Sequence, residues 1–181
     1  MQVIPTKING LFIIQPKVFE DARGYFFESY NKDIFQKVGI KDEFLQDNQS
    51  LSQKGVLRGL HFQNPPHAQS KLVRVITGSV LDVAVDIRKN SPSYGQHVTE
   101  VLSEKNKTMM FIPEGFAHGF LVLEDNTVFS YKCSRVYNKE SEDAVFWNDP
   151  DIGIDWKIKN PVLSEKDRIS KRFKDFESKF I

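Results

Sequence analysis

The chain has 181 residues, with 25 Lys and Arg against 24 Asp and Glu, so its formal net charge at pH 7 is +1. This balance argues against a nucleic-acid stripe or a polybasic membrane patch, and the single cysteine, Cys133, excludes an internal disulfide framework and a multi-cysteine zinc site. Because no apolar run reaches the length of a membrane span, we expect one domain over residues 1–181, located in the cytoplasm.

A short helix is predicted over residues 32–38. Asn31 is a suitable N-cap, because its side-chain oxygen can accept hydrogen bonds from the free backbone N–H groups of the first turn. Gly39 marks the end, since glycine readily takes the left-handed conformation that terminates helices.

From about residue 71 to residue 137, apolar residues alternate with polar or small ones, which is the period of half-buried strands. Val83, Val85 and Ile87, for example, alternate with Asp82 and Asp86. Turn signals such as Gly78-Ser79 and Pro113-Glu114-Gly115 separate these runs at short spacing. Many short strands with frequent turns predict an all-β sandwich or barrel, and the 15 phenylalanines supply bulk for its interior.

A second helix is predicted at the C-terminal end. Ser164 opens the segment, and Ile169, Phe173, Phe176 and Phe180 follow at spacings of four, three and four. This pattern predicts an amphipathic helix that packs one face against the barrel.

The segment Pro113-Glu114-Gly115-Phe116-Ala117-His118 resembles half of the cupin signature, in which a Pro-x-Gly turn directs a histidine toward the barrel interior. In metal-binding cupins the other half supplies His-x-His and a glutamate. Here that place reads His61-Phe62-Gln63, and Lys71 follows where a cation is unfavourable beside a metal. Because a catalytic divalent ion needs about three converging ligands, we expect no metal site.

Motifs along nearly the whole chain, from about residue 11 to residue 170, resemble those of the dTDP-4-dehydrorhamnose 3,5-epimerase family. They read, in order, Arg23-Gly24-Tyr25-Phe26-Phe27-Glu28-Ser29, Gln46-Asp47-Asn48, Val56-Leu57-Arg58-Gly59-Leu60-His61, Pro65-Pro66-His67-Ala68-Gln69, Lys71-Leu72-Val73, Gly115-Phe116-Ala117-His118-Gly119-Phe120, Tyr131-Lys132, Trp147-Asn148-Asp149-Pro150 and Leu163-Ser164-Glu165-Lys166-Asp167. The resemblance implies a metal-free jelly-roll (cupin) barrel with short flanking helices, a homodimer, and epimerisation of a nucleotide-diphosphate-linked 4-keto-6-deoxyhexose at C3 and C5.

This chemistry suits the residue types. C3 and C5 flank the C4 ketone, so proton removal gives an enolate that can be reprotonated from the opposite face without a redox cofactor. The chain agrees, because it has neither a Gly-x-Gly-x-x-Gly fingerprint nor a P-loop. Such a reaction needs a base, a group that orients it, a positive group at the oxyanion and an acid across the ring.

The resemblance implies that His61 is the base and that Asp167 orients it and stabilises its imidazolium form. Each has an ordinary structural alternative. A histidine at a strand end is often satisfied by backbone groups. Ser164-x-x-Asp167 also reads as a capping box, and a carboxylate bonded to its own helix cap is less free to orient His61.

Lys71 is the implied partner of the enolate oxygen, Tyr131 the implied acid on the far face, and His118 a binding group near the sugar. A strand lysine is more commonly solvated. Tyr131 shares its parity with Phe129 and Cys133, so it lies on an apolar face where a tyrosine is more often part of the core.

Further positions resemble the substrate-binding residues of the family. Arginine suits phosphate oxygens better than lysine does, so the two arginines among them would bind the diphosphate. The set comprises Arg23 and Arg58 at the diphosphate, Phe26 and Tyr137 stacked on the base, and Glu28, Gln46, Asn48, Glu142 and Lys166. Two positions depart from the family pattern: Gln49 stands where many relatives have histidine and Ser70 where glycine is usual, and Gln49 is expected to alter the sugar or nucleotide pocket.

Three alternatives remain open from the sequence. The enzyme could epimerise C3 alone, or act on a GDP- or CDP-linked hexose or heptose. A metal-dependent cupin enzyme is a second alternative, and bound metal after purification would favour it. The third is a non-catalytic sugar-nucleotide binding protein, which turnover of any 4-keto substrate would exclude.

Overall fold

The computed structural model describes residues 1–181, and strands dominate it. A six-stranded sheet has the order β1-β2-β10-β7-β12-β5, a five-stranded sheet has the order β13-β6-β11-β8-β9, and β3 and β4 form a separate hairpin. The strands are β1 (Gln2–Pro5), β2 (Phe12–Gln15), β3 (Phe19–Asp21), β4 (Gly24–Phe26), β5 (Gln46–Ser52), β6 (Leu57–Gln63), β7 (Lys71–Thr77), β8 (Ser79–Asp86), β9 (His97–Ser103), β10 (Met109–Ile112), β11 (Phe116–Val122), β12 (Thr127–Cys133) and β13 (Glu142–Ala144).

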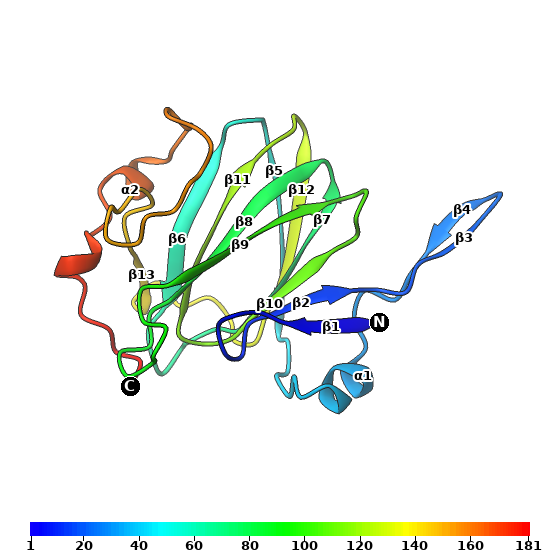
Figure 1. The fold of residues 1–181 in the computed structure, drawn as a ribbon, viewed down its shortest axis with the longest axis horizontal. Coiled ribbons are helices and arrows are strands. Elements are labelled where there is room, and N and C mark those ends of the chain that lie inside the picture. Colours follow the sequence, from blue (N-terminus) through cyan, green and yellow to red (C-terminus); the bar gives the residue numbers. More distant parts are fainter.

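The two large sheets face each other and are antiparallel throughout, which confirms the predicted jelly roll (Figure 1). Apolar residues of both sheets meet between them, among them Val73, Ala84, Phe120 and Phe129. Burial of such side chains is the main favourable contribution to folding. The polar site described below lies beside this apolar core.

The strand β8 departs from the predicted half-buried pattern, because every residue except Leu81 is buried. Its inner residues, such as Ala84, lie between the sheets, while Val83 and Val85 belong to a second cluster on the outer face of the five-stranded sheet. Trp147 and Phe176, which follow in the chain, cover this outer face. Because the sheet is covered on both faces here, neither side of β8 faces water.

The first predicted helix is confirmed. The helix α1 spans Lys32–Lys37, and the Asn31 side chain accepts hydrogen bonds from the backbone N–H groups of Asp33 at 3.1 Å and Ile34 at 3.3 Å. Gly39 follows with a φ of 93°, the left-handed conformation expected of a glycine after a helix. Phe35 anchors the helix against the outer face of the six-stranded sheet.

The predicted C-terminal helix is wrong beyond its first turn. The helix α2 spans only Glu165–Arg168, and a single 3-10 turn, η1, spans Phe173–Asp175. The backbone carbonyl of Lys171 instead accepts a hydrogen bond from Phe146 N at 2.7 Å, so the chain pairs with a neighbouring segment rather than with itself.

The aromatic side chains of this region still pack against the sheet. The rings of Phe176 and Phe180 lie 5.4 Å and 6.3 Å from the ring of Phe62, although an irregular chain carries them. Ile169, which the helical pattern placed on the same face, is 81% exposed. Tertiary contact thus overrides the helical spacing here.

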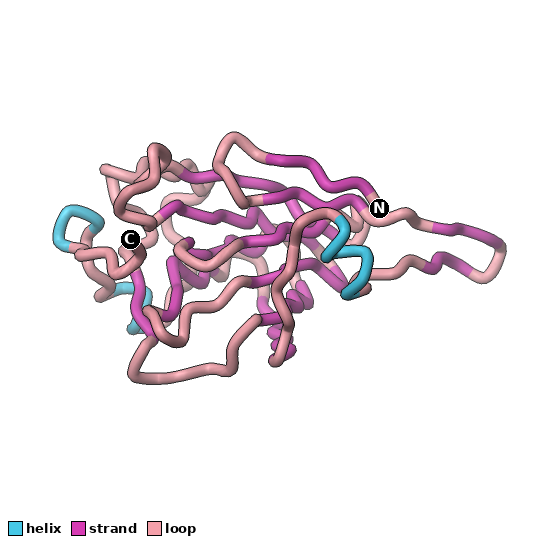
Figure 2. Tube along the Cα trace, turned by 90° about the horizontal axis from the view of Figure 1, so that it is seen from below, coloured by secondary structure: helices cyan, strands magenta, loops and turns pink.

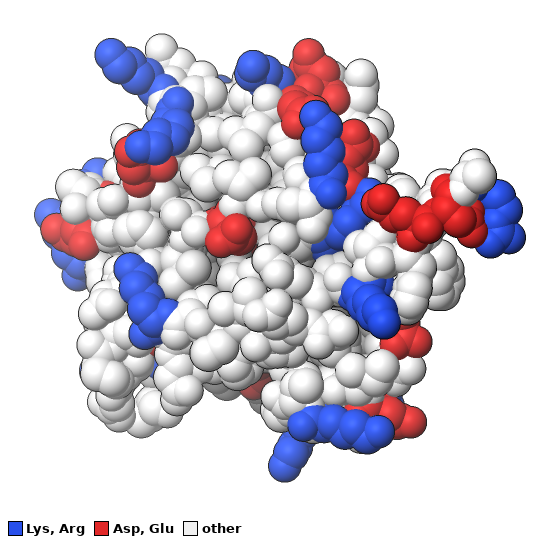
Figure 3. Space-filling view, turned by 45° about the vertical axis from the view of Figure 1, so that its right-hand side comes forward, with Lys and Arg blue, Asp and Glu red and all other residues white.

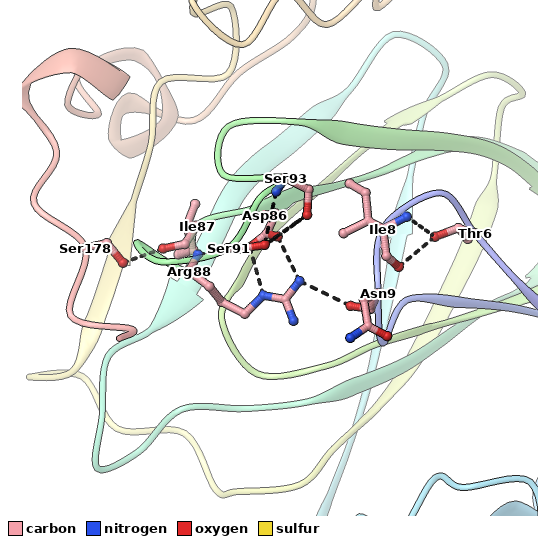
Figure 4. A network of polar contacts seen from close by, with 9 residues as sticks. All are labelled: Thr6, Ile8, Asn9, Asp86, Ile87, Arg88, Ser91, Ser93 and Ser178. Atoms are coloured by element: carbon pink, nitrogen blue, oxygen red, sulfur yellow. Dashed lines mark hydrogen bonds and ion pairs between the residues drawn. The ribbon is translucent and has the colours of Figure 1, made fainter.

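A buried carboxylate at the end of β8 ties together segments that lie far apart in the chain (Figure 4). Asp86 accepts hydrogen bonds from Arg88 at 2.7 Å, Ser91 at 2.6 Å and Ser93 at 2.7 Å. Arg88 also donates to the carbonyl of Asn9 at 3.1 Å. Burial alone would raise the pKa of Asp86, but these hydrogen bonds outweigh it and lower the pKa.

The β3–β4 hairpin projects away from the two sheets (Figures 1 and 2). Its aromatic residues are exposed: Phe19 at 53%, Tyr25 at 55% and Phe26 at 69%. On the face next to this hairpin, charged side chains of both signs lie around a mostly uncharged area with an acidic group near its middle (Figure 3). No helix in the structure is both long and apolar enough to cross a membrane.

Candidate active site

A pocket of about 350 Å³ opens between the two sheets. Its lining is mainly polar, and it comes from β5, β6, β7, β12 and the residues around β13. The lining residues are Gln46, Asn48, His61, Phe62, Gln63, Gln69, Lys71, Tyr131, Tyr137 and Glu142. Seven of the residues predicted from the sequence therefore converge here: Gln46, Asn48, His61, Lys71, Tyr131, Tyr137 and Glu142.

His61 is paired with a buried carboxylate. Its Nε2 lies 2.5 Å from Oδ1 of Asp167, and the Asp167 side chain is only 3% exposed. The capping interaction is present as well, because Ser164 Oγ accepts from Asp167 N at 3.2 Å and donates to Oδ2 at 2.7 Å. The carboxylate therefore serves the helix cap and the imidazole at once, with one oxygen for each side chain.

The protonation of Asp167 follows from these contacts. Burial would raise the pKa of its carboxyl group, but the hydrogen bonds from His61 and Ser164 outweigh burial and lower the pKa. The carboxylate is thus held in its charged form, which favours a proton on the imidazole nitrogen that faces it.

A bulge in β6 brings Arg58 and His61 to the same side of the sheet. On β11, His118 pairs with His61 and Phe120 with Arg58, so three steps along β6 match two steps along β11. Without the extra residue, side chains three apart would point to opposite faces. Gly59 lies at this point with a φ of 143°, a conformation that favours glycine.

Close packing explains why β6 and β11 meet at glycines. A Cβ atom at Gly59 would lie 2.5 Å from the Cα of Gly119, and one at Gly119 would lie 2.8 Å from the carbonyl oxygen of Arg58. Leu57 and Leu60, also three apart, both belong to the outer cluster, which agrees with the change of side at the bulge.

Lys71 and Tyr131 approach the pocket from the opposite sheet. Lys71 pairs across the strands with Cys133, two residues after Tyr131 on β12. Burial lowers the pKa of Lys71, while Cys133, Asp82 and Glu142 act in the opposite direction. Burial raises the pKa of Tyr131, so its hydroxyl retains its proton at neutral pH.

His118 lies beside His61, as its cross-strand partner on β11. Its Nε2 is 3.0 Å and 3.1 Å from the two carboxylate oxygens of Asp82, a side chain with no exposed surface. Burial lowers the pKa of His118, and Asp82 only partly opposes this effect. Each of the two histidines thus faces its own aspartate.

A chain of polar contacts forms the rim. The hydroxyl of Tyr137 donates to Glu142 at 2.9 Å, and Lys166 forms an ion pair with the same carboxylate. On β5, Gln46 donates to Asn48 Oδ1 at 3.0 Å. The predicted binding residues around the opening are therefore bonded to one another.

Three predicted binding residues lie away from the pocket within this chain. Arg23 and Phe26 are on the projecting hairpin, where the Arg23 side chain is 90% exposed and pairs with Asp21. Glu28 is exposed and accepts a hydrogen bond from Asn31 at 3.1 Å. A hairpin that extends outward cannot return to the pocket of its own chain.

The two departures from the family pattern lie outside the pocket lining. Gln49 is exposed, whereas its neighbour Asn48 lines the pocket, so the expected effect of Gln49 on the pocket lining is not found. Ser70 is buried, and its hydroxyl donates to Asp42 at 2.6 Å.

Sequence reasoning missed four residues of the site. Phe62, Gln63 and Gln69 line the pocket, and Asp82 is the partner of His118. A carboxylate in the apolar run Ser79-Val80-Leu81-Asp82-Val83-Ala84-Val85-Asp86 was a usable signal, because buried carboxylates are rarely without a partner.

Comparisons with known proteins show the family to which the chain belongs. The model of the dTDP-4-dehydrorhamnose 3,5-epimerase family matches residues 5–175. The dTDP-4-dehydrorhamnose 3,5-epimerase of Shigella flexneri is 53% identical over 176 residues, which cover 97% of both chains.

Solved structures agree. A dTDP-4-dehydrorhamnose 3,5-epimerase from Elizabethkingia anophelis NUHP1 is 51% identical with a TM-score of 0.93, covering 97% of each chain. The enzyme RmlC from Legionella pneumophila Philadelphia 1, in complex with dTDP-4-keto-L-rhamnose, is 48% identical with a TM-score of 0.93, covering 97% of this chain and 94% of that one. The chain therefore belongs to the dTDP-4-dehydrorhamnose 3,5-epimerase family.

Proposed function

We propose that the protein epimerises dTDP-4-dehydro-6-deoxyglucose at C3 and C5 through an enolate, without a cofactor, to give dTDP-4-dehydrorhamnose. One observation carries this proposal: His61, which is paired with the buried Asp167, lines the same pocket as Lys71 and Tyr131 of the facing sheet. The names of the relatives and the dTDP-sugar bound to the Legionella enzyme support the substrate.

His61 acts as the base. Because its Nε2 is engaged with Asp167, Nδ1 is the ring nitrogen free to take a proton from C3 or C5. The adjacent C4 carbonyl makes these protons acidic, since the resulting carbanion is delocalised onto O4 as an enolate. The imidazolium that forms is stabilised by the Asp167 carboxylate.

Lys71 stabilises the negative charge that develops on O4, because an ammonium group in a partly buried site interacts strongly with an enolate. Tyr131 then donates its proton to the opposite face of the same carbon. The two groups that exchange protons with the sugar come from opposite sheets, β6 and β12, which is the arrangement that inversion requires. His118, held by Asp82, borders the sugar.

Arg58 binds the diphosphate, and Tyr137 stacks on the base. The Arg58 guanidinium donates to the hydroxyl of Ser52 over 3.1 Å and 3.3 Å, and its positive charge partly opposes the rise that burial causes in the pKa of Tyr131.

Arg23, Phe26 and Glu28 complete the pocket of a second copy in a homodimer. The support is their location: they lie on or next to a hairpin that leaves the body of its own chain, and the aromatic rings of that hairpin are exposed. Large exposed apolar side chains on a projecting segment commonly mark an interface.

Proton NMR in deuterium oxide tests the reaction. Metal-stripped protein is mixed with dTDP-4-keto-6-deoxyglucose, and loss of both the C3 and the C5 proton signals is expected. Exchange at C3 alone would show that the enzyme epimerises C3 only. Absence of exchange with this substrate would refute the proposal, and GDP- and CDP-linked keto sugars would then be tried.

A further inference from the structure

The segment between β12 and β13, residues 134–141, crosses from the six-stranded sheet to the five-stranded sheet beside the pocket. It has no regular secondary structure, so no strand ladder supports it. Tyr137, which lines the pocket, lies on this segment and is 54% exposed. Packing of its ring against the core therefore contributes little to its position.

Two glutamines from different sheets hold consecutive backbone groups of this segment. Gln46, the first residue of β5, accepts a hydrogen bond from the backbone N–H of Tyr137 at 2.7 Å. Gln63, the last residue of β6, accepts one from the backbone N–H of Asn138, also at 2.7 Å. The backbone on both sides of the Tyr137 Cα is thereby tied to both sheets.

The amide nitrogens of the glutamines add further contacts. Gln63 Nε2 donates to the carbonyl of His67 at 2.7 Å and to that of Val136 at 3.4 Å. Gln69 Nε2 donates to the carbonyl of Arg135 at 2.7 Å. We name Gln46, Gln63 and Gln69 the glutamine clamp.

Gln63 is central to the glutamine clamp. It is only 4% exposed, and both of its N–H groups and its carbonyl oxygen are already bonded to the protein. A buried amide with all its donors in use is not available to bind a ligand, although it lies in the wall of the pocket.

We propose that Gln63, with the rest of the glutamine clamp, is a positioning residue that sets the ring of Tyr137 at the pocket opening and so determines the affinity for the base of the nucleotide. This inference rests on the proposed function, because it takes the ligand of Tyr137 to be the base of dTDP. It concerns binding of the nucleotide and not the proton transfers at the sugar.

Calorimetry with dTDP on the full chain tests the inference. Gln63→Met keeps the length of the side chain but removes three hydrogen bonds, and dTDP binding is expected to weaken by about tenfold, the effect of roughly 1.4 kcal/mol. The KM for the keto sugar should rise by the same factor while kcat stays unchanged. Gln96→Met, in a concavity away from this pocket, is the matched control and should bind as the wild type does.

A double-mutant cycle separates positioning from a general structural role. If Gln63 acts through Tyr137, its substitution should have almost no further effect on dTDP binding in the Tyr137→Ala background. Additive losses in the double variant, or a fall in kcat, would overturn the inference. If Gln63→Met does not fold, Gln69→Met takes its place in the same cycle, with a smaller loss expected because it removes one hydrogen bond.

Failure of the inference and failure of the proposed function are distinguishable. A wild-type protein that binds dTDP but does not epimerise the keto sugar would refute the proposed reaction, while the cycle would still decide the role of Gln63. A wild-type protein that does not bind dTDP would overturn both.

Discussion

The Asp167 carboxylate shows how one residue can belong to a helix cap and to the proposed catalytic pair. The sequence presented these as competing interpretations, but a carboxylate has two oxygens, and Oδ1 and Oδ2 take different partners. Ser164 is therefore a support for the His61 pair as well as a cap. This division could not be predicted, since a capping pattern does not tell which way the second oxygen points.

Substitutions along this chain of contacts should have graded effects. His61→Asn should slow exchange of the C3 and C5 protons by about 10²- to 10⁴-fold, because it removes the proposed base. Asp167→Asn should slow the exchange less than His61→Asn does. Ser164→Ala should mainly lower the free energy of unfolding, by about 1 kcal/mol, because it removes the helix cap. Exchange rates by NMR and urea denaturation measure the two effects, and an intact exchange rate in His61→Asn would remove it as the base.

His118 makes stability depend on pH. Because burial lowers its pKa in the folded protein, the unfolded chain binds a proton here near pH 6.5 that the folded chain does not. The free energy of unfolding should therefore fall as pH drops below about 6.5, by up to about 1.4 kcal/mol per pH unit from this residue.

Urea denaturation between pH 5 and pH 8 measures the effect of His118, with His118→Asn as comparison. The free energy of unfolding of the variant should fall less steeply with decreasing pH than that of the wild type. Parallel curves for the two proteins would show that His118 takes up its proton equally in both states.

At the scale of elements, the sequence predicts those helices and strands whose formation depends on local signals. Strands between residues 71 and 137 follow from alternation, and α1 follows from its capping residues Asn31 and Gly39, so these elements were predictable. The C-terminal segment was not, because its phenylalanines have helical spacing but the backbone of Lys171 pairs with Phe146. The bulge at Gly59 was also not predicted, since alternation alone gives no sign of an extra residue.

The irregular C-terminal segment should still contribute strongly to stability. Phe176 is 8% exposed and contacts Phe62 edge to face, so Phe176→Ala should lower the free energy of unfolding by about 3 kcal/mol. Ile169→Ala, at a residue 81% exposed, should change it by less than about 0.5 kcal/mol. Equal effects in denaturation experiments would favour the helix that the sequence suggested.

At the scale of the whole molecule, the proposed catalytic residues and the predicted binding residues of the hairpin differ in whether they reach the pocket of their own chain. His61, Lys71 and Tyr131 meet within one chain, because strands of two facing sheets carry them. Arg23 and Phe26 do not reach that pocket, and no pattern within one chain tells which copy a projecting hairpin serves.

Mixed dimers test the role of the hairpin. Chains carrying His61→Asn and chains carrying Arg23→Ala should each be poorly active alone. A dimer of one of each holds one intact site, made of His61 from one chain and Arg23 from the other, so equal co-expression should restore about a quarter of wild-type activity. Activity no greater than the sum of the two variants would place the hairpin outside the partner's pocket.

The bulge in β6 also determines how this strand tolerates changes in length. Residues before Gly59 face their side of the sheet only because one extra residue intervenes before Leu60. Deletion of Gly59 would restore strict alternation, turning Arg58 into the apolar layer and Leu57 into the pocket. In this strand a one-residue deletion would therefore exchange the polar and apolar faces of the segment before Gly59. The same deletion in a surface turn would alter only the turn.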